Sequence, residues 1–352
     1  MTTYELTRDQ GSVTLSSDRI MVHLDLPTTG WHLEVRTVPS SAAFPAPRLL
    51  GGQWLLQNPA AYAIDRASLH VVSDGVPFAA GVECRPTLDV GATGAGPAVR
   101  LPAVDLSGIR SAILVTLAVD GGGPHPQLTV ALPEGQVAPT DPSLSAAARH
   151  ALAEVRSRLD SQVVDASENL NLTVCVDASA SMLPVAQGGD LEALVNALHG
   201  MSHVLSWGKS FRVGLVDLDV TWLGSGAPGS SPGAAVAQEL LARPAFIGGR
   251  LGHEQLVANS VVDNTMTYVV TDSVPADAEQ IARSGEVEGE ARHLVLMSAG
   301  HDDEALTAAL GMPVSVWRPG LGPDDADYRK TIYGLLRSCF DPRSDYAKRL
   351  LT

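Results

Sequence analysis

The segment Leu172-Thr-Val-Cys-Val-Asp-Ala-Ser-Ala-Ser-Met182 decides how the fold of this 352-residue chain is interpreted. It opens as an apolar run rich in β-branched residues, which is typical of a buried strand. It ends by presenting Asp177, Ser179 and Ser181 at alternate positions. Because ligands of open parallel sheets bind outside the carboxyl ends of the strands, this order of residues predicts a polar binding site there.

The composition limits the class of protein and its partners. Hydrophobic residues make up 45% of the chain, which is sufficient for folded cores, and the formal net charge is −15. This negative charge disfavours a nucleic-acid partner. The opening Met1–Leu15 has no apolar signal-peptide core, and no later apolar run reaches transmembrane length. The three cysteines are far apart and lack zinc spacing, so we expect a cytoplasmic protein.

The N-terminal part of the chain predicts an all-β sandwich. Short strand-like runs are separated by Gly, Pro and Ser, and helical periodicity is nearly absent. The expected strands are Ser12–Leu15, Ile20–Leu26, Trp31–Val38, Ala67–Val72, Ser111–Val119 and Gln127–Leu132.

A change of rhythm then divides the chain. Ser143–Leu159 has helical spacing, and we expect it to connect two domains, capped by the preceding Asp141-Pro-Ser143. A fragment that starts near Ser161 is therefore expected to fold alone. The predicted parts are a sandwich over 1–138, a connecting segment over 139–167, an α/β domain over 168–342 and a tail over 343–352.

Strands and helices alternate in the C-terminal part, which predicts a doubly wound, mostly parallel sheet with helices on both faces. The expected strands are Leu172–Val176, Phe211–Val216, Met266–Thr271, His293–Ser298 and Pro313–Trp317. The expected helices are Leu191–Leu205 with Asp190 as N-cap, Ala234–Ala242, His253–Val262, Ala276–Arg283, Asp302–Leu310 and Asp324–Phe340.

Two of the expected strands end in an aspartate, Asp177 and Asp272. If the strand order is 3-2-1-4-5-6, the two strands are neighbours where the order reverses, and these aspartates lie side by side. Their carboxylates and the hydroxyls of Ser179 and Ser181 form the kind of oxygen ligand set that Mg²⁺ or Mn²⁺ prefers. Asp177 could instead simply cap the next helix.

Asp177-x-Ser179-x-Ser181 after an apolar strand, with Asp272 ending a later strand, resembles the metal-ion-dependent adhesion site (MIDAS) of von Willebrand factor A (vWA) domains. The resemblance covers roughly residues 169–340. It implies that the serines contact Mg²⁺ or Mn²⁺ directly and that the aspartates hold the ion directly or through water. It also implies that an acidic residue of a protein partner fills the remaining position, in a non-enzymatic interaction protein.

The sequence departs from the vWA pattern at Gly248-Gly-Arg250, where that family has Gly-Gly-Thr. A guanidinium donates hydrogen bonds only and repels a cation. Arg250 could pair with Asp177 or Asp272 and occupy the place of the ion. Two hypotheses therefore stay open, a working metal site and a metal-free interaction module.

The segment Ser181–Leu198 resembles the vWA domain of TerF-type proteins of bacterial tellurium resistance, which is fused to a TerD-type domain. Gly11–Leu15 with Met21–Leu26 is similar to the opening strands of TerD. The resemblance implies a role in tellurium resistance or chemical stress. TerD-like domains bind calcium through clustered aspartates, and the nearest candidate here, Trp31–Val35, keeps only Glu34.

A serine hydrolase with Ser179 or Ser181 as nucleophile is the alternative from the enzyme class. That chemistry needs a nucleophile elbow, a histidine base and an oxyanion hole. Gly-x-Ser-x-Gly is absent around these serines, and Asp177 precedes them where a metal ligand would stand.

Arg250→Thr is expected to tighten Mg²⁺ binding, because the change adds a hydroxyl ligand and removes a positive charge. Isothermal titration calorimetry of variant and wild type measures the difference. Equal or weaker binding by the variant would mean that Arg250 points away from the site.

Overall fold

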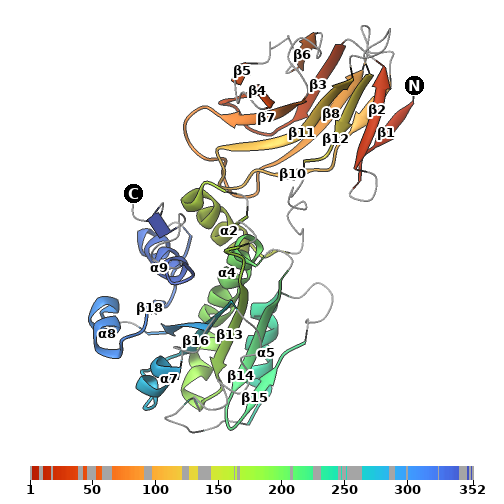
Figure 1. The fold of residues 1–352 in the computed structure, drawn as a ribbon. Helices are drawn as coiled ribbons and strands as arrows, with labels where there is room; N and C mark the ends of the chain where they lie inside the picture. Colours follow the sequence, from red (N-terminus) through yellow and green to blue (C-terminus); the bar gives the residue numbers. More distant parts are fainter. Residues whose placement is uncertain are drawn as a thin grey trace. The chain divides into compact units, whose positions relative to one another are not determined.

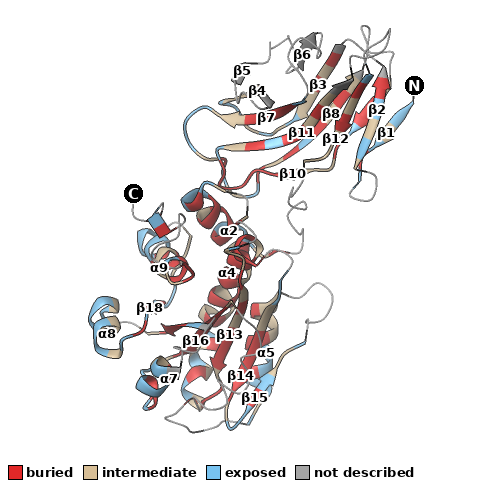
Figure 2. Cartoon of the chain, viewed as in Figure 1, coloured by how far each residue is buried: buried red, intermediate tan, exposed pale blue. Residues whose placement is uncertain are grey.

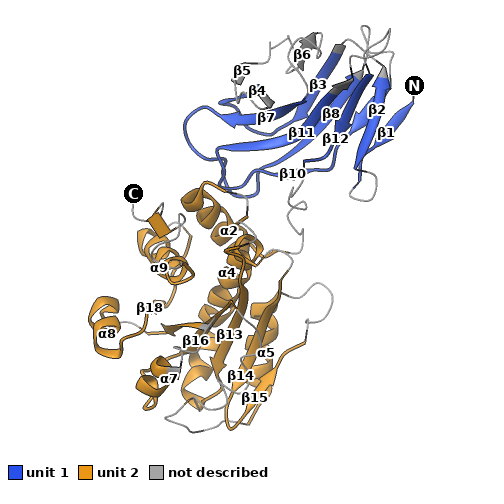
Figure 3. Ribbon diagram, viewed as in Figure 1, with its two compact units in different colours: residues 1–141 blue, residues 142–352 orange. Residues whose placement is uncertain are grey.

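The chain forms two compact units, Met1–Asp141 and Pro142–Thr352 (Figure 3). Each unit has hydrophobic clusters of its own, and none of the described residues belongs to the clusters of both. A computed structural model describes residues 2–7, 11–16, 19–38, 43–45, 53–57, 66–90, 97–120, 127–133, 144–161, 163–164, 167–206, 209–224, 231–244, 247, 251, 264–284, 290–298, 300–323, 325–340, 347–348 and 350.

The N-terminal unit consists of two sheets, as Figure 1 shows. One sheet has the order β1 (Thr3–Glu5), β9 (Ala98–Arg100), β8 (Glu83–Val90), β3 (Arg19–Asp25) and β6 (Gln53–Gln57), with β10 (Val104–Asp105) on β8. The other has the order β2 (Ser12–Ser16), β12 (Gln127–Ala131), β11 (Ser111–Asp120), β7 (Arg66–Ser73), β4 (Trp31–Val38) and β5 (Ala43–Pro45). Apart from the parallel pair of β1 and β9, the described neighbours are antiparallel. Alternate residues of both sheets, such as Val22, Leu33 and Leu69, share one core.

The C-terminal unit is built on one six-stranded sheet. Its order is β15 (Val220–Trp222), β14 (Phe211–Val216), β13 (Asn171–Asp177), β16 (Thr265–Thr271), β17 (Glu290–Leu296) and β18 (Val314–Val316). Numbered along this unit, the order is 3-2-1-4-5-6, and only β15 is antiparallel to its neighbour. The α/β fold with a parallel sheet is thus confirmed.

Helices flank both faces of this sheet. Val174 and Tyr268 lie in one cluster with α4 and α9, whereas Cys175 and Val269 lie in another with α7 and α8. Strands covered on both sides need apolar residues at successive positions, and Figure 2 shows β13 and β16 buried along most of their length. The helices are α2 (Ala146–Leu159), α3 (Leu183–Gln187), α4 (Asp190–Leu205), α5 (Pro232–Ala242), α7 (Ala278–Ser284), α8 (Asp303–Leu310) and α9 (Ala326–Arg337).

Helix α2 differs from the connecting helix that the sequence predicts. The hydroxyl of Ser145, not the Asp-Pro-Ser preceding it, accepts from the backbone N–H of Ala148 and caps the helix. The helix packs so closely on α4 that a Cβ at Gly200 would lie 2.0 Å from the carbonyl oxygen of Ala148. Five of its apolar side chains lie in the core of the C-terminal unit, namely Ala148, Ala151, Leu152, Val155 and Leu159.

Two smaller differences concern the ends of elements. Asp190 is the first residue of α4 and not its N-cap, which is Gly189 at φ 83°; the Asp190 carboxylate accepts instead from the backbone N–H of Gly320 at 2.8 Å. Ala347 and Leu350, in the predicted tail, are buried in the core. The predicted helix His253–Val262 lies outside the described residues, and the other predicted helices and strands match described elements to within a few residues.

We expect a fragment of residues 142–352 to fold cooperatively and a fragment of residues 161–352 to be molten or aggregated. The shorter fragment lacks α2 and so exposes the apolar side of α4 that α2 covers. Circular dichroism and thermal melts of the two fragments compare them directly. Equally sharp transitions would show that α2 is dispensable for this core.

Candidate metal centre

The sheet places the predicted site residues at one edge. Asp177 ends β13 and pairs with Val216 of β14, while Val176 pairs with Val270 of β16. Asp272 directly follows β16, and Ser179 precedes a single 3₁₀ turn over Ala180–Met182. In-register parallel pairing therefore brings the loops after β13 and β16 together at the carboxyl edge of the sheet.

A chain of hydrogen bonds joins the four predicted residues. The backbone N–H of Ser179 donates to Oδ1 of Asp177 at 2.8 Å. The hydroxyls of Ser179 and Ser181 lie 2.9 Å apart, and Ser181 donates to Oδ1 of Asp272 at 2.9 Å. The structure thus brings together Asp177, Ser179, Ser181 and Asp272.

Thr271 is a fifth member of the site, which the sequence prediction missed. Its hydroxyl donates to Oδ2 of Asp177 at 2.8 Å and also lies 3.2 Å from the carbonyl oxygen of Ser273. Its side chain is 1% exposed. The sequence feature that could have identified Thr271 as a site residue is its position directly before Asp272. The sequence alone predicts only that it is the last residue of the strand Met266–Thr271.

The electrostatics of the site favour a cation. Burial, and to a smaller extent the charge of Asp272, raise the pKa of the Asp177 carboxyl, against the hydrogen bonds from Ser179 and Thr271. A positive ion between the two carboxylates would offset both effects. Ser179 is 3% exposed while Ser181 is exposed, so the site opens to solvent on the Ser181 side.

The donor set fits a hard divalent cation. Two carboxylates and three hydroxyls supply oxygen only, which suits Mg²⁺ or Mn²⁺ better than a soft metal. Within the described residues, no group of three or more His, Cys, Asp or Glu side chains could hold a metal. Among the residues of this site, only Asp177 and Asp272 are His, Cys, Asp or Glu. The site therefore needs its hydroxyl groups as additional ligands to hold a cation.

Other residues considered from the sequence do not join the described site. Arg250 with its two preceding glycines lies outside the described residues, as do His253 and Glu254. His199 packs edge-on against His203, with ring centroids 5.0 Å apart.

The acidic turn between β14 and β15 neighbours the site. The backbone N–H of Asp217 donates to the carbonyl oxygen of Asp219 at 3.1 Å, which closes the turn. Nη1 of Arg243 lies 3.4 Å from Oδ2 of Asp217, so this carboxylate is paired. Asp219 is exposed.

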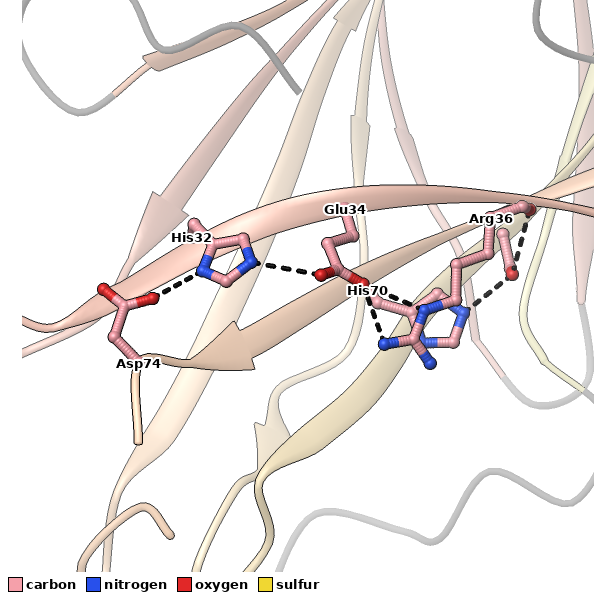
Figure 4. A network of polar contacts seen from close by, with 6 residues as sticks. His32, Glu34, Arg36, His70 and Asp74 are labelled. Carbon is pink, nitrogen blue, oxygen red and sulfur yellow. Dashed lines mark hydrogen bonds and ion pairs between the residues drawn. The ribbon is translucent and has the colours of Figure 1, made fainter. Parts of the chain in front are cut away.

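The N-terminal unit carries a separate polar network (Figure 4). His32 lies between Asp74 and Glu34, with Nδ1 2.5 Å from Asp74 Oδ1 and Nε2 3.2 Å from Glu34 Oε1. Arg36 donates twice to Glu34 Oε2, at 2.8 and 3.0 Å. Glu34, the nearest candidate for a calcium ligand, is therefore held in an ion pair.

The second histidine of Figure 4 is buried. Nε2 of His70 and the hydroxyl of Ser68 form a hydrogen bond of 2.8 Å. Burial lowers the pKa of His70 to about 4. It is therefore neutral at pH 7. Burial alone would lower the pKa of His32, but hydrogen bonds to Asp74 and Glu34 outweigh it and raise that pKa. The network links β4 to β7 and to the turn after β7.

Comparison with known proteins identifies no family for this chain. The chain matches no protein-family model, and no curated protein matches it. Among the described helices, none combines the length and the apolar character that crossing a membrane requires.

Asp177→Asn is expected to raise the melting temperature at pH 7 in EDTA by about 2–4 °C, the shift that about 1 kcal/mol produces in a unit of this size. Because the folded state raises the pKa of Asp177, wild-type stability falls as pH rises from the usual value of 3.8 through the folded one. Asparagine keeps the oxygen that accepts from Ser179 and carries no charge.

Thermal melts across pH test this expectation. The difference between variant and wild type should shrink as pH falls through the folded pKa and vanish below 3.8, where the wild-type carboxyl is protonated in both states. Asp219→Asn, in the neighbouring exposed turn, controls for the loss of one negative charge. A variant that is less stable than wild type at pH 7 would contradict the electrostatic cost assigned to Asp177.

Proposed function

We propose that this protein is a non-enzymatic interaction protein whose C-terminal unit holds Mg²⁺ or Mn²⁺ at Asp177, Ser179, Ser181 and Asp272. The observation that carries the proposal is the hydrogen-bonded chain of these side chains at the carboxyl edge of the sheet. Thr271 would orient Asp177 by its hydrogen bond. The bound ion would supply a Lewis-acidic position for a carboxylate of a protein partner.

The strand order supports a vWA-type unit. The site lies where the order 3-2-1-4-5-6 reverses, between the first and fourth strands, and the third strand is the antiparallel edge. Asp177-x-Ser179-x-Ser181 and Asp272 stand in this setting at the positions that the resemblance to the MIDAS implies. This combination of topology and ligand types is more specific than either alone.

The two-unit organisation supports a TerF-like protein. An N-terminal unit of mostly antiparallel sheets precedes the α/β unit, as in a chain that joins a TerD-like domain to a vWA domain. We propose that it acts in the cytoplasm in tellurium resistance or a related chemical stress response. The net charge of −15 favours a protein partner over a nucleic acid.

A hydrolytic role for Ser179 or Ser181 lacks its general base. The two hydroxyls bond to each other and to Asp272, and no histidine in the described part of the chain hydrogen-bonds to either serine. A serine nucleophile needs such a base within hydrogen-bond reach. The remaining alternative is a metal-free interaction module in which Arg250 replaces the ion.

Millimolar Mg²⁺ or Mn²⁺ should raise the melting temperature, because an ion that binds only the folded state stabilises it by about 2.7 kcal/mol at a hundred times its Kd. Ser179→Ala combined with Ser181→Ala removes two ligands and should abolish the rise. Ser273→Ala is the matched control, since Ser273 is exposed and its hydrogen bond to Thr271 uses its backbone carbonyl, which alanine keeps. A wild-type protein that does not respond would favour the metal-free module.

A further inference from the structure

Four of the large exposed hydrophobic residues in the described part of the chain belong to the C-terminal unit, in segments that follow its strands or connect to them. In the C-terminal unit they are Leu218, Leu241, Ile247 and Val274, with exposed fractions of 76, 43, 92 and 38%. Exposed apolar residues scattered singly are ordinary, whereas a group beside a polar site is typical of an interaction surface. We refer to these four residues as the apolar rim.

Strand register places two members of the rim on either side of the site. Leu218 lies at the tip of the turn that follows β14, two residues after Val216, the partner of Asp177. Val274 lies two residues after Asp272. Because neighbouring strands are ~4.8 Å apart, β14 and β16 flank β13 at a separation of roughly 10 Å. Leu218 and Val274 therefore bracket the loop that carries the serines.

The other two members belong to a segment whose two ends are anchored near the same edge. Leu241 is in the last turn of α5, and Arg243 at the end of that helix bonds to Asp217 in the turn after β14. The backbone N–H of Leu251 donates to the buried carboxylate of Asp277, just beyond β16, at 3.0 Å. Ile247 lies between these two anchors in the chain.

The charges around the rim restrict the partner further. Asp219 is exposed beside Leu218, and Asp217 keeps a 32% exposed side chain although it pairs with Arg243. A carboxylate of a partner that approaches the ion would meet these negative groups. Basic residues next to that carboxylate would offset the repulsion.

We propose that the apolar rim binds a segment of a partner protein in which one aspartate or glutamate lies between large apolar side chains, with lysine or arginine at its flanks. This inference rests on the proposed metal-dependent function, because the carboxylate is the group that the ion takes. The rim then supplies the contacts that select the segment, since apolar side chains buried at the centre of an interface dominate its affinity.

Selection from a displayed library of short random peptides tests the proposal on the full chain in MgCl₂. We expect the enriched peptides to contain an acidic residue between apolar ones together with lysine or arginine. Fluorescence anisotropy then measures the Kd of the most enriched peptide. Leu218→Ser and Ile247→Ser should each weaken binding about tenfold or more. Val76→Ser, at a position 76% exposed in the N-terminal unit, is the matched control and should leave the Kd unchanged.

The outcomes separate this inference from the function beneath it. One outcome is that the peptides need Mg²⁺ and do not bind the Ser179→Ala, Ser181→Ala variant, but bind both rim variants as tightly as the wild type. This outcome would contradict the role of the apolar rim and support the metal site. Peptides that bind equally in EDTA and to that variant would overturn the metal-dependent function and the inference with it. A selection that enriches no magnesium-dependent peptide, or only acidic peptides without apolar residues, contradicts the rim as well.

Discussion

The parallel pairing of β13 with β16 is the constraint on which the candidate site depends. The hydrogen bond from Thr271 to Asp177 joins residues 94 positions apart, and in-register pairing of the two strands makes it possible. Both strands are covered by helices on their two faces, so their positions are fixed by close packing and not by the loops. The site therefore lies on a rigid edge, and the loops only have to carry short side chains across a small distance.

Much of this arrangement could be predicted from local pattern. The apolar run Leu172–Val176 followed by alternate oxygen-bearing residues identified both the strand and its binding end. Two of the strands that the prediction missed break the local rules: β8 contains Pro86, which disfavours a strand interior, and β15 has only three residues. Thr271 was missed for a different reason, since its partner is distant in sequence and a threonine at a strand end is ordinary.

Tertiary packing explains why the sequence predicts α2 only as a connecting helix. Its periodicity predicted a helix, and the helix is present, but spacing alone does not tell which helix it will contact. The decisive residue is Gly200 on α4, where the absence of a side chain allows α2 to approach the backbone. A glycine in the middle of a helix lowers its intrinsic stability by about 1 kcal/mol, a cost that is offset when two helices pack closely at that point. The sequence alone does not show whether Gly200 allows close packing of another helix or only weakens α4.

The choice of ligand types at the edge also determines what the site can attract. Two carboxylates neutralise one divalent cation, and neutral hydroxyls add coordination without adding charge. A third carboxylate would leave the site negative and repel an acidic partner, whereas hydroxyls keep the ion attractive to one more carboxylate. The negative charge that remains nearby, on Asp217 and Asp219, stands outside the hydrogen-bonded chain and would act on the flanking residues of the proposed partner. In the proposed function, affinity for the acidic group and discrimination among partners would come from different residues of the same edge, so that a substitution could change one property and leave the other.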